Sequence, residues 1–157
     1  MTHLDREKMV DRKILLVEDN PDDEFLALRA LRQNKVANEV VVARDGVEAL
    51  DYLFGEGSQA GKEPLLPEVI LLDLKLPKID GLEVLRRVRA DERTRRIPTV
   101  ILTTSGERVD IEASYDGGCN SYIRKPVDFE QFIDAVRQLG LYWLVLNKTA
   151  QSDSLHT

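Results

Sequence analysis

Ile14-Leu15-Leu16-Val17-Glu18-Asp19 is an apolar run that ends in two carboxylates, and Val69-Ile70-Leu71-Leu72-Asp73 repeats the pattern further along the chain. Continuous apolar runs of this length are typical of strands buried on both faces of a parallel sheet. Val100-Ile101-Leu102-Thr103 ends in a hydroxyl, and Tyr122-Ile123-Arg124-Lys125 ends in an amine. Ligands bind open parallel sheets beyond the carboxyl ends of the strands. If these four runs are neighbours, their polar ends meet at one edge and suit a divalent cation and a phosphoryl group.

Helical patterns separate the apolar runs. We expect helices after Pro21, after Asp45-Gly46 and after Asp80-Gly81, a short helix over 109–115, and a last helix that extends past Gly140. A further strand is predicted over 39–43, and 55–67 is a long loop rich in Gly, Ser and Pro. The apolar residues expected on the helix faces are Phe25, Leu28 and Leu31; Val47, Leu50 and Phe54; Leu82, Leu85 and Val88; and Phe129, Phe132, Ile133, Val136 and Trp143.

Five strands that alternate with five helices predict an α/β fold, a doubly wound (βα)5 flavodoxin-like three-layer sandwich. We expect a parallel sheet with strand order 2-1-3-4-5, whose switch point lies between strands one and three. Glu18-Asp19 and Asp73 follow those two strands. The carboxylates are therefore expected where this topology opens a crevice.

The composition indicates one small globular domain. The chain has 157 residues, 43% apolar and 32% charged, with a formal charge of −6 and a pI near 5.0. This charge argues against nucleic-acid binding, and the arginines around the third helix alternate with acidic residues as on a solvated face. No membrane span or secretory signal is visible, so a cytoplasmic location is expected. We expect a flexible segment over 1–11, a folded domain with an extended last helix over 12–148, and a flexible tail over 149–157.

Four motifs follow the expected strands: Leu16-Val17-Glu18-Asp19-Asn20, Leu72-Asp73-Leu74-Lys75-Leu76-Pro77, Leu102-Thr103-Thr104-Ser105 and Tyr122-Ile123-Arg124-Lys125-Pro126. Together they resemble the receiver domain of two-component response regulators, and the resemblance covers residues 12 to 140. The ending Gly140-Leu141-Tyr142-Trp143-Leu144 and the long loop before the third strand are also similar to stand-alone receivers that are often paired with bacterial phytochrome-type kinases.

The resemblance implies a phosphoacceptor and a Mg²⁺ site. Asp73 would accept a phosphoryl group from the phosphohistidine of a sensor histidine kinase. Asp19, Asp73 and the backbone carbonyl of Lys75 would bind Mg²⁺ directly, and Glu18, which stands where many receivers have Asp, would act through water. Mg²⁺ neutralises the anionic oxygens that a carboxylate nucleophile meets. Taken singly, Glu18-Asp19 is better explained as a helix cap, and Asp73 as an ordinary turn residue at a strand end.

The same resemblance implies roles for residues beyond the acidic pair. The Thr103 hydroxyl would bind a phosphoryl oxygen; Thr104 is the neighbouring candidate, and the register with Leu102 favours Thr103. The Lys125 ammonium would pair with the acyl phosphate, and the bond to Pro126 would be cis. Tyr122 would be the aromatic residue that changes position with Thr103. Taken alone, Thr103 is better explained as a β-branched residue at a strand end, and Lys125 as a surface lysine. The alternative for Tyr122 is a fixed, half-buried tyrosine on an outer strand.

Three classes of function fit the pattern. The first is a signalling switch. It would catalyse only its own phosphorylation and its own slow dephosphorylation, and would not be an enzyme in any other sense. The second is an aspartyl-phosphate hydrolase, which normally needs an Asp where this chain has Lys75. The third is a flavin binder, whose phosphate loop is disfavoured by the carboxylates from Glu18 to Asp23.

The end of the chain carries more apolar residues than one core face buries. We expect a homodimer through the fourth and fifth helices and the last strand, with Tyr142 and Leu146 near its centre. The alternative is a C-terminal extension that folds back onto its own domain. The residues concerned are Leu139, Leu141, Tyr142, Leu144, Val145 and Leu146.

Overall fold

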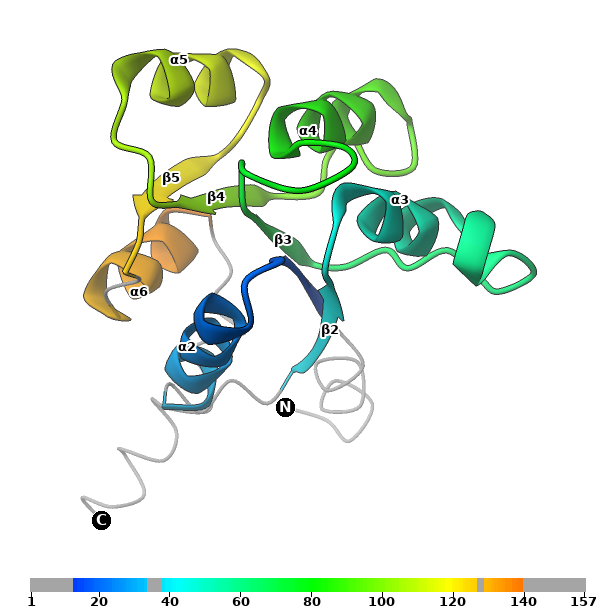
Figure 1. Ribbon diagram of the computed structural model, residues 1–157, viewed down its shortest axis with the longest axis horizontal. Coiled ribbons are helices and arrows are strands. Elements are labelled where there is room, and N and C mark those ends of the chain that lie inside the picture. Colours follow the sequence, from blue (N-terminus) through cyan, green and yellow to red (C-terminus); the bar gives the residue numbers. More distant parts are fainter. Residues whose placement is uncertain (1–12, 34–37, 127–128, 140–157) are drawn as a thin grey trace.

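Five parallel strands form the centre of the protein in the order β2-β1-β3-β4-β5 (Figure 1). The computed structural model describes residues 13–33, 38–126 and 129–139. The predicted strand order and fold class are confirmed. The strands are β1 (Lys13–Val17), β2 (Glu39–Ala43), β3 (Val69–Leu72), β4 (Thr99–Thr103) and β5 (Ser121–Arg124).

Helices cover both faces of the sheet and make it the middle of three layers. Figure 1 shows α2 and α6 on one face and α3, α4 and α5 on the other. None of the helices in the described ranges has the length and apolar character that crossing a membrane requires. The helices are α2 (Pro21–Gln33), α3 (Gly46–Phe54), α4 (Gly81–Ala90), α5 (Arg108–Asp116) and α6 (Phe129–Gln138), with a short 3-10 helix η1 (Gly57–Gln59) in the long loop before β3.

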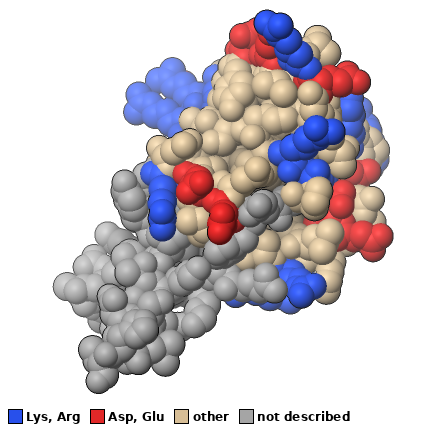
Figure 2. All heavy atoms as spheres, turned by 90° about the vertical axis from the view of Figure 1, so that its left-hand side faces the viewer, with Lys and Arg blue, Asp and Glu red and all other residues tan. Residues whose placement is uncertain are grey.

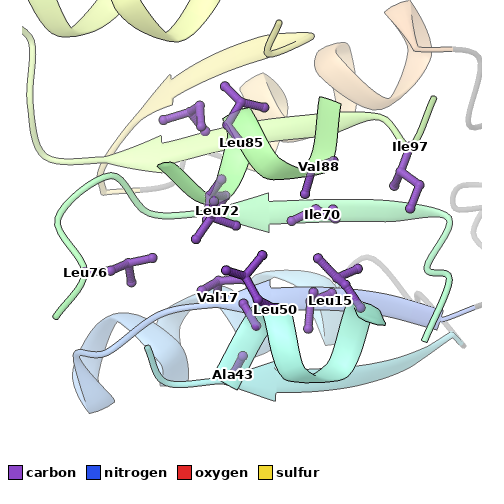
Figure 3. Close-up of a cluster of buried hydrophobic side chains, with 14 of the residues drawn as sticks. Leu15, Val17, Ala43, Leu50, Ile70, Leu72, Leu76, Leu85, Val88 and Ile97 are labelled. Carbon is purple, nitrogen blue, oxygen red and sulfur yellow. The ribbon is translucent and has the colours of Figure 1, made fainter. Parts of the chain in front are cut away.

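Alternate residues of the central strands enter two separate cores, because successive side chains of a strand point to opposite faces. One core packs against α3 and α4 (Figure 3) and the other against α2 and α6. Full burial of each large side chain contributes about 1.5–3 kcal/mol, so both cores resist a shift in strand register. The first core takes Leu15, Val17, Ile70 and Leu72, and the second takes Ile14, Leu16, Val69 and Leu71.

Two of the expected helix faces were wrong in part. In α2 the buried residues include Ala27 and Leu31, whereas Phe25 is 61% exposed. Phe25 precedes Ala27 by two residues, which is about 200° of helix rotation, and therefore points away from the sheet. In α3, Val47 lies at the edge of the buried stripe and is exposed, while Leu50 is buried as expected.

Arg89 corrects the view that the arginines around α4 form a solvated face. Its guanidinium is half-buried and donates to the carbonyl oxygens of Gly118 (3.0 Å), Arg95 (3.1 Å) and Ile97 (2.8 Å), and to Asn120 Oδ1 (3.0 Å). Burial lowers the pKa of Arg89. The side chain joins the loops before β4 and β5, at the end of the sheet opposite the carboxylates. Arg86 and Arg93 do pair with nearby acidic residues on the surface, as expected.

Several predictions concern parts of the chain outside the described residues. They are the flexible ends over 1–11 and 149–157, the extension of the last helix past Gly140, and the proposed dimer contacts of Tyr142 and Leu146. The side chains of Phe129, Val136 and Trp143 also lie outside the described set. Phe132 and Ile133 of α6 are buried, as the helical spacing predicted.

Candidate functional site

The carboxylates of Glu18, Asp19 and Asp73 lie together at the carboxyl edge of the sheet. β1 and β3 are paired neighbours, with Val17 opposite Leu72, so the residues that follow them emerge side by side. Ligand oxygens of the three carboxylates lie within 4.8 Å of one another. Glu18 is 3% and Asp73 7% exposed, whereas Asp19 is open to solvent. Hard oxygen ligands with one open side match what Mg²⁺ requires, because this ion keeps several waters.

Backbone hydrogen bonds fix the start of each side chain. The N–H of Glu18 donates to the Ala43 carbonyl (2.9 Å), and the N–H of Asp73 donates to the Val17 carbonyl (3.1 Å). The sheet's hydrogen-bonding pattern therefore continues one residue beyond the strands. Rigid placement of this kind suits a site that must hold several like charges close together.

Gly81, the first residue of α4, allows the chain to close behind Asp73. A Cβ atom at Gly81 would lie 2.2 Å from the Asp73 carbonyl oxygen, which is well inside van der Waals contact. The Gly81 N–H also donates to the Leu74 carbonyl (2.9 Å). Only glycine permits this approach, so the Asp80-Gly81 turn that the sequence predicts also shapes the site.

Lys125 reaches across β4 to the carboxylates. Its ammonium contacts Glu18 and lies 3.0 Å from both Asp73 Oδ2 and Asp23 Oδ2. The Lys125 N–H donates to the Thr103 carbonyl (2.7 Å), and the bond from Lys125 to Pro126 is cis, as the resemblance implied. Asp23 was not among the site residues predicted from the sequence. Its position in the first turn after Asn20 was visible, but the reach of Lys125 was not.

The cluster shifts two pKa values. Burial raises the pKa of Glu18 to about 7, and the negative charge of Asp73 acts in the same direction, while Lys125 opposes both. Burial alone would lower the pKa of Lys125, but the hydrogen bond with Glu18 and the charge of Asp73 outweigh burial and raise it. Three carboxylates around one ammonium leave an excess of negative charge, which a bound cation would neutralise.

Thr103 ends β4 and is fully buried at the same edge, between the strands that lead to Asp73 and Lys125. Its Oγ1 accepts from the Ser105 N–H (3.4 Å). Thr104, the alternative candidate, is exposed. The structure thus brings Thr103 to the site edge together with the carboxylates and Lys125.

Tyr122 is half-buried on β5 and connects to the loop after Thr103. Its hydroxyl donates to the Ser105 carbonyl (2.8 Å), and burial raises the pKa of Tyr122. Ser105 Oγ in turn donates to Asp110 Oδ2 (2.5 Å). Asp110, on α5, is a second site-edge residue that was not predicted, since nothing in its sequence spacing distinguishes it from a surface acid.

Lys75 lies on the exposed rim beside Asp73. Its backbone N–H donates to Asp73 Oδ1 (3.2 Å), and its ammonium lies 3.9 Å from Asp110 Oδ2. Lys75 therefore connects the acidic cluster to the α5 side of the rim, where Asp110 holds Ser105.

A family model described as the response regulator receiver domain matches residues 14–137. The chain is 43% identical to the probable methanogenesis regulatory protein FilR2 of Methanothrix harundinacea, over 87% of this chain and 86% of that protein. It is 37% identical to response regulator Rcp1 of Synechocystis, over 83% of this chain and 88% of that protein.

Solved structures match along similar lengths. The bacteriophytochrome response regulator AtBRR is 54% identical, with a TM-score of 0.78 over 87% of this chain and 98% of that one. The Mn²⁺-bound form of Rcp1 is 36% identical, with a TM-score of 0.70 over 86% of this chain and 96% of that one.

Proposed function

The chain belongs to the response regulator receiver domain family, and from that premise we propose that it is a stand-alone receiver that accepts a phosphoryl group on Asp73. The observation that carries the proposal is the position of Asp73 between two other carboxylates and the Lys125 ammonium, at the switch point of the sheet. The match with AtBRR, a bacteriophytochrome response regulator, extends over 98% of that chain and supports a response regulator of the same kind.

The proposed reaction is a phosphoryl transfer from the phosphohistidine of a sensor histidine kinase. An Asp73 carboxylate oxygen attacks phosphorus, the new P–O bond forms, the P–N bond to the kinase imidazole breaks, and the imidazole leaves and takes up a proton. Lys125 Nζ, 3.0 Å from Asp73 Oδ2, is placed to pair with the phosphoryl oxygens. The Thr103 hydroxyl is proposed to bind another of these oxygens. The chain does no chemistry beyond its own phosphorylation and slow dephosphorylation.

Glu18, Asp19 and Asp73 are proposed to hold Mg²⁺, with the Lys75 backbone carbonyl as a further ligand and Glu18 acting through water. The charges of these residues and their oxygen ligands suit this ion. The bound ion would neutralise the attacking carboxylate and the phosphoryl oxygens, whose mutual repulsion otherwise opposes transfer. The Mn²⁺-bound form of Rcp1 supports a divalent cation in this family.

The proposed output is a change at the β5 edge of the sheet, where Tyr122 is the switch residue. Figure 2 shows acidic and basic side chains scattered among uncharged surface on this face. A groove here is lined by Tyr115 and Ile111 of α5, Tyr122 of β5, and Asp134 and Ala135 of α6. We place the homodimer contact on α5, α6 and β5, the elements predicted from sequence as the fourth and fifth helices and the last strand. The two tyrosines and the apolar residues that line this groove beside an edge strand support this choice.

The partner is proposed to be a phytochrome-type histidine kinase in the cytoplasm. The support is the similarity to AtBRR, a bacteriophytochrome response regulator, at 54% identity. No role for nucleic acid or membrane is proposed.

Phosphotransfer from candidate kinases of the same genome tests the proposal. Each kinase is first phosphorylated and then mixed with this protein or with its Asp73→Asn variant. One kinase is expected to lose its label rapidly to the wild type and to retain it in the presence of the variant. Failure of every kinase to transfer label to the wild type would contradict the proposal.

A further inference from the structure

Asp23 is a fourth carboxylate at the site edge, and the first turn of α2 holds it there. Asn20 Oδ1 accepts from the N–H groups of Asp22 (2.9 Å) and Asp23 (3.2 Å), which caps the helix. This cap turns the Asp23 side chain toward the sheet, where it is 29% exposed, and leaves Asp22 in solvent. Asp23 Oδ2 lies 3.0 Å from Lys125 Nζ.

The three carboxylates around Lys125 differ in what else they bind. An ammonium has three donors, and that of Lys125 contacts Glu18, Asp73 and Asp23. Among the described residues, Glu18 and Asp73 also belong to the cluster that is able to hold a cation, whereas Asp23 does not. Asp23 is thus a partner of the ammonium alone.

A cation and the ammonium compete for the same two carboxylates. A divalent ion held directly by Asp73, and by Glu18 through water, repels the Lys125 ammonium and weakens its contacts with both groups. The side chain of Lys125 is 7% exposed, so a displaced ammonium recovers little from water. The contact with Asp23 remains available while the other two are weakened.

We propose that Asp23 is a positioning residue that holds the Lys125 ammonium at the site when Mg²⁺ takes over Glu18 and Asp73. This inference rests on the proposed Mg²⁺ site and adds to it a residue outside the cation's ligands. Asp23 lowers the cost of displacing the ammonium and thereby strengthens Mg²⁺ binding. It also keeps the ammonium within reach of a phosphoryl group on Asp73.

Substitution of Asp23, with Asp22 as the matched control, separates this role from a general charge effect. Asp23→Asn and Asp22→Asn remove one negative charge from adjacent positions in the same helical turn, and only the first charge contacts Lys125. The Mg²⁺ dissociation constant is measured by NMR titration with the metal alone. We expect it to be about fivefold higher in Asp23→Asn than in Asp22→Asn, which corresponds to about 1 kcal/mol. Asp23→Glu, which keeps the carboxylate, is expected to recover most of the affinity.

A Lys125→Met background tests whether Asp23 acts through the ammonium. There, Asp23→Asn and Asp22→Asn are expected to change the Mg²⁺ dissociation constant almost equally. A difference that persists undiminished would mean that Asp23 acts on the cation directly, and this would overturn the inference. Lys125→Gln is the substitute if the methionine variant does not fold.

Two outcomes distinguish this inference from the proposed function. Equal Mg²⁺ affinities of Asp23→Asn and Asp22→Asn, with tight binding by the wild type, would overturn the role of Asp23 and leave the receiver site standing. Absence of Mg²⁺ binding by the wild type would contradict the proposed site itself. In the metal-free protein, a double-mutant cycle on unfolding is expected to show coupling between Asp23 and Lys125, and no coupling would also overturn the inference.

Discussion

The Tyr122 hydroxyl donates a 2.8 Å hydrogen bond to the backbone carbonyl of Ser105, and so connects the edge strand to the loop that follows Thr103. Ser105 is itself held by Asp110 and by Thr103 Oγ1. A movement of Thr103 toward a phosphoryl group would displace the acceptor of the Tyr122 hydroxyl. We therefore propose that this contact transmits a change at the site to the β5 surface.

Tyr122→Phe is expected to remove this contact while leaving the fold and the acceptor intact. The loss of one hydrogen bond costs about 1 kcal/mol in the free energy of unfolding, measured by urea denaturation. Phosphorylation should then produce smaller NMR shift changes along β5 than in the wild type. Shift changes of equal size in the two proteins would contradict the role of Tyr122.

Mg²⁺ is expected to stabilise the protein, because it binds the folded carboxylate cluster and relieves repulsion within it. Thermal unfolding with and without millimolar Mg²⁺ measures the effect. Asp19→Ala, which removes an exposed carboxylate of the cluster, should reduce the shift in the melting temperature, whereas Asp22→Ala should leave most of it. An undiminished shift in Asp19→Ala counts against the site.

Asp45 gives the folded protein a defined dependence on pH. Burial alone would raise its pKa, but the hydrogen bond from the Glu48 N–H (2.7 Å) and the contact with Lys78 lower it below the ordinary value of 3.8. Because the pKa of Asp45 is lower in the folded than in the unfolded protein, its ionised carboxylate stabilises the fold at any pH above the unfolded-state pKa. This stabilisation is lost as the pH falls through the folded-state pKa. Asp45→Ala should cost about 1 kcal/mol at pH 7, since it removes the cap of α3, and this cost should shrink below pH 3.8. A penalty that is constant from pH 7 to pH 3 would be inconsistent with this account.

If the protein is a homodimer, as proposed, its molecular mass in solution should be twice that of one chain. Light scattering at micromolar concentration should give twice the chain mass for the wild type and a lower value for Tyr142→Asp, which places a charge at the predicted centre of the contact. The alternative, a C-terminal extension folded onto its own domain, predicts a monomer in both cases. A monomeric mass that is unchanged by phosphorylation would defeat the dimer without affecting the receiver assignment.

The sequence predicted the strand order and the common edge of the site because both depend on local patterns. The apolar runs before Glu18 and Asp73 are long enough to mark buried strands, and parallel pairing then places their ends together. Phe25 was wrongly predicted to face the sheet. A small residue such as Ala27 packs in a core as well as a larger one does, so the spacing of large apolar residues left two possible buried faces for this helix. Local spacing does not say which side of α2 meets the sheet.

Asp23 and Asp110 were missed for a different reason. Their roles depend on long side chains that cross the site edge: Lys125 reaches Asp23 over a separation of 102 residues, and Lys75 approaches Asp110 from another loop. Neither acid differs in sequence from a solvated residue in the first turn of a helix. Such contacts follow from the three-dimensional arrangement of the strand ends and from no single motif.

The most direct test of the central claim is the position of the phosphoryl group. Incubation with Mg²⁺ and a small acyl phosphate donor, followed by intact mass measurement and peptide mapping, should find one phosphoryl group that is acid-stable, base-labile and located on Asp73. The Asp73→Asn variant, which keeps the shape of the side chain, should remain unmodified. Equal labelling of the two proteins, or a label mapped to another residue of the wild type, would contradict the assignment of Asp73 as the acceptor.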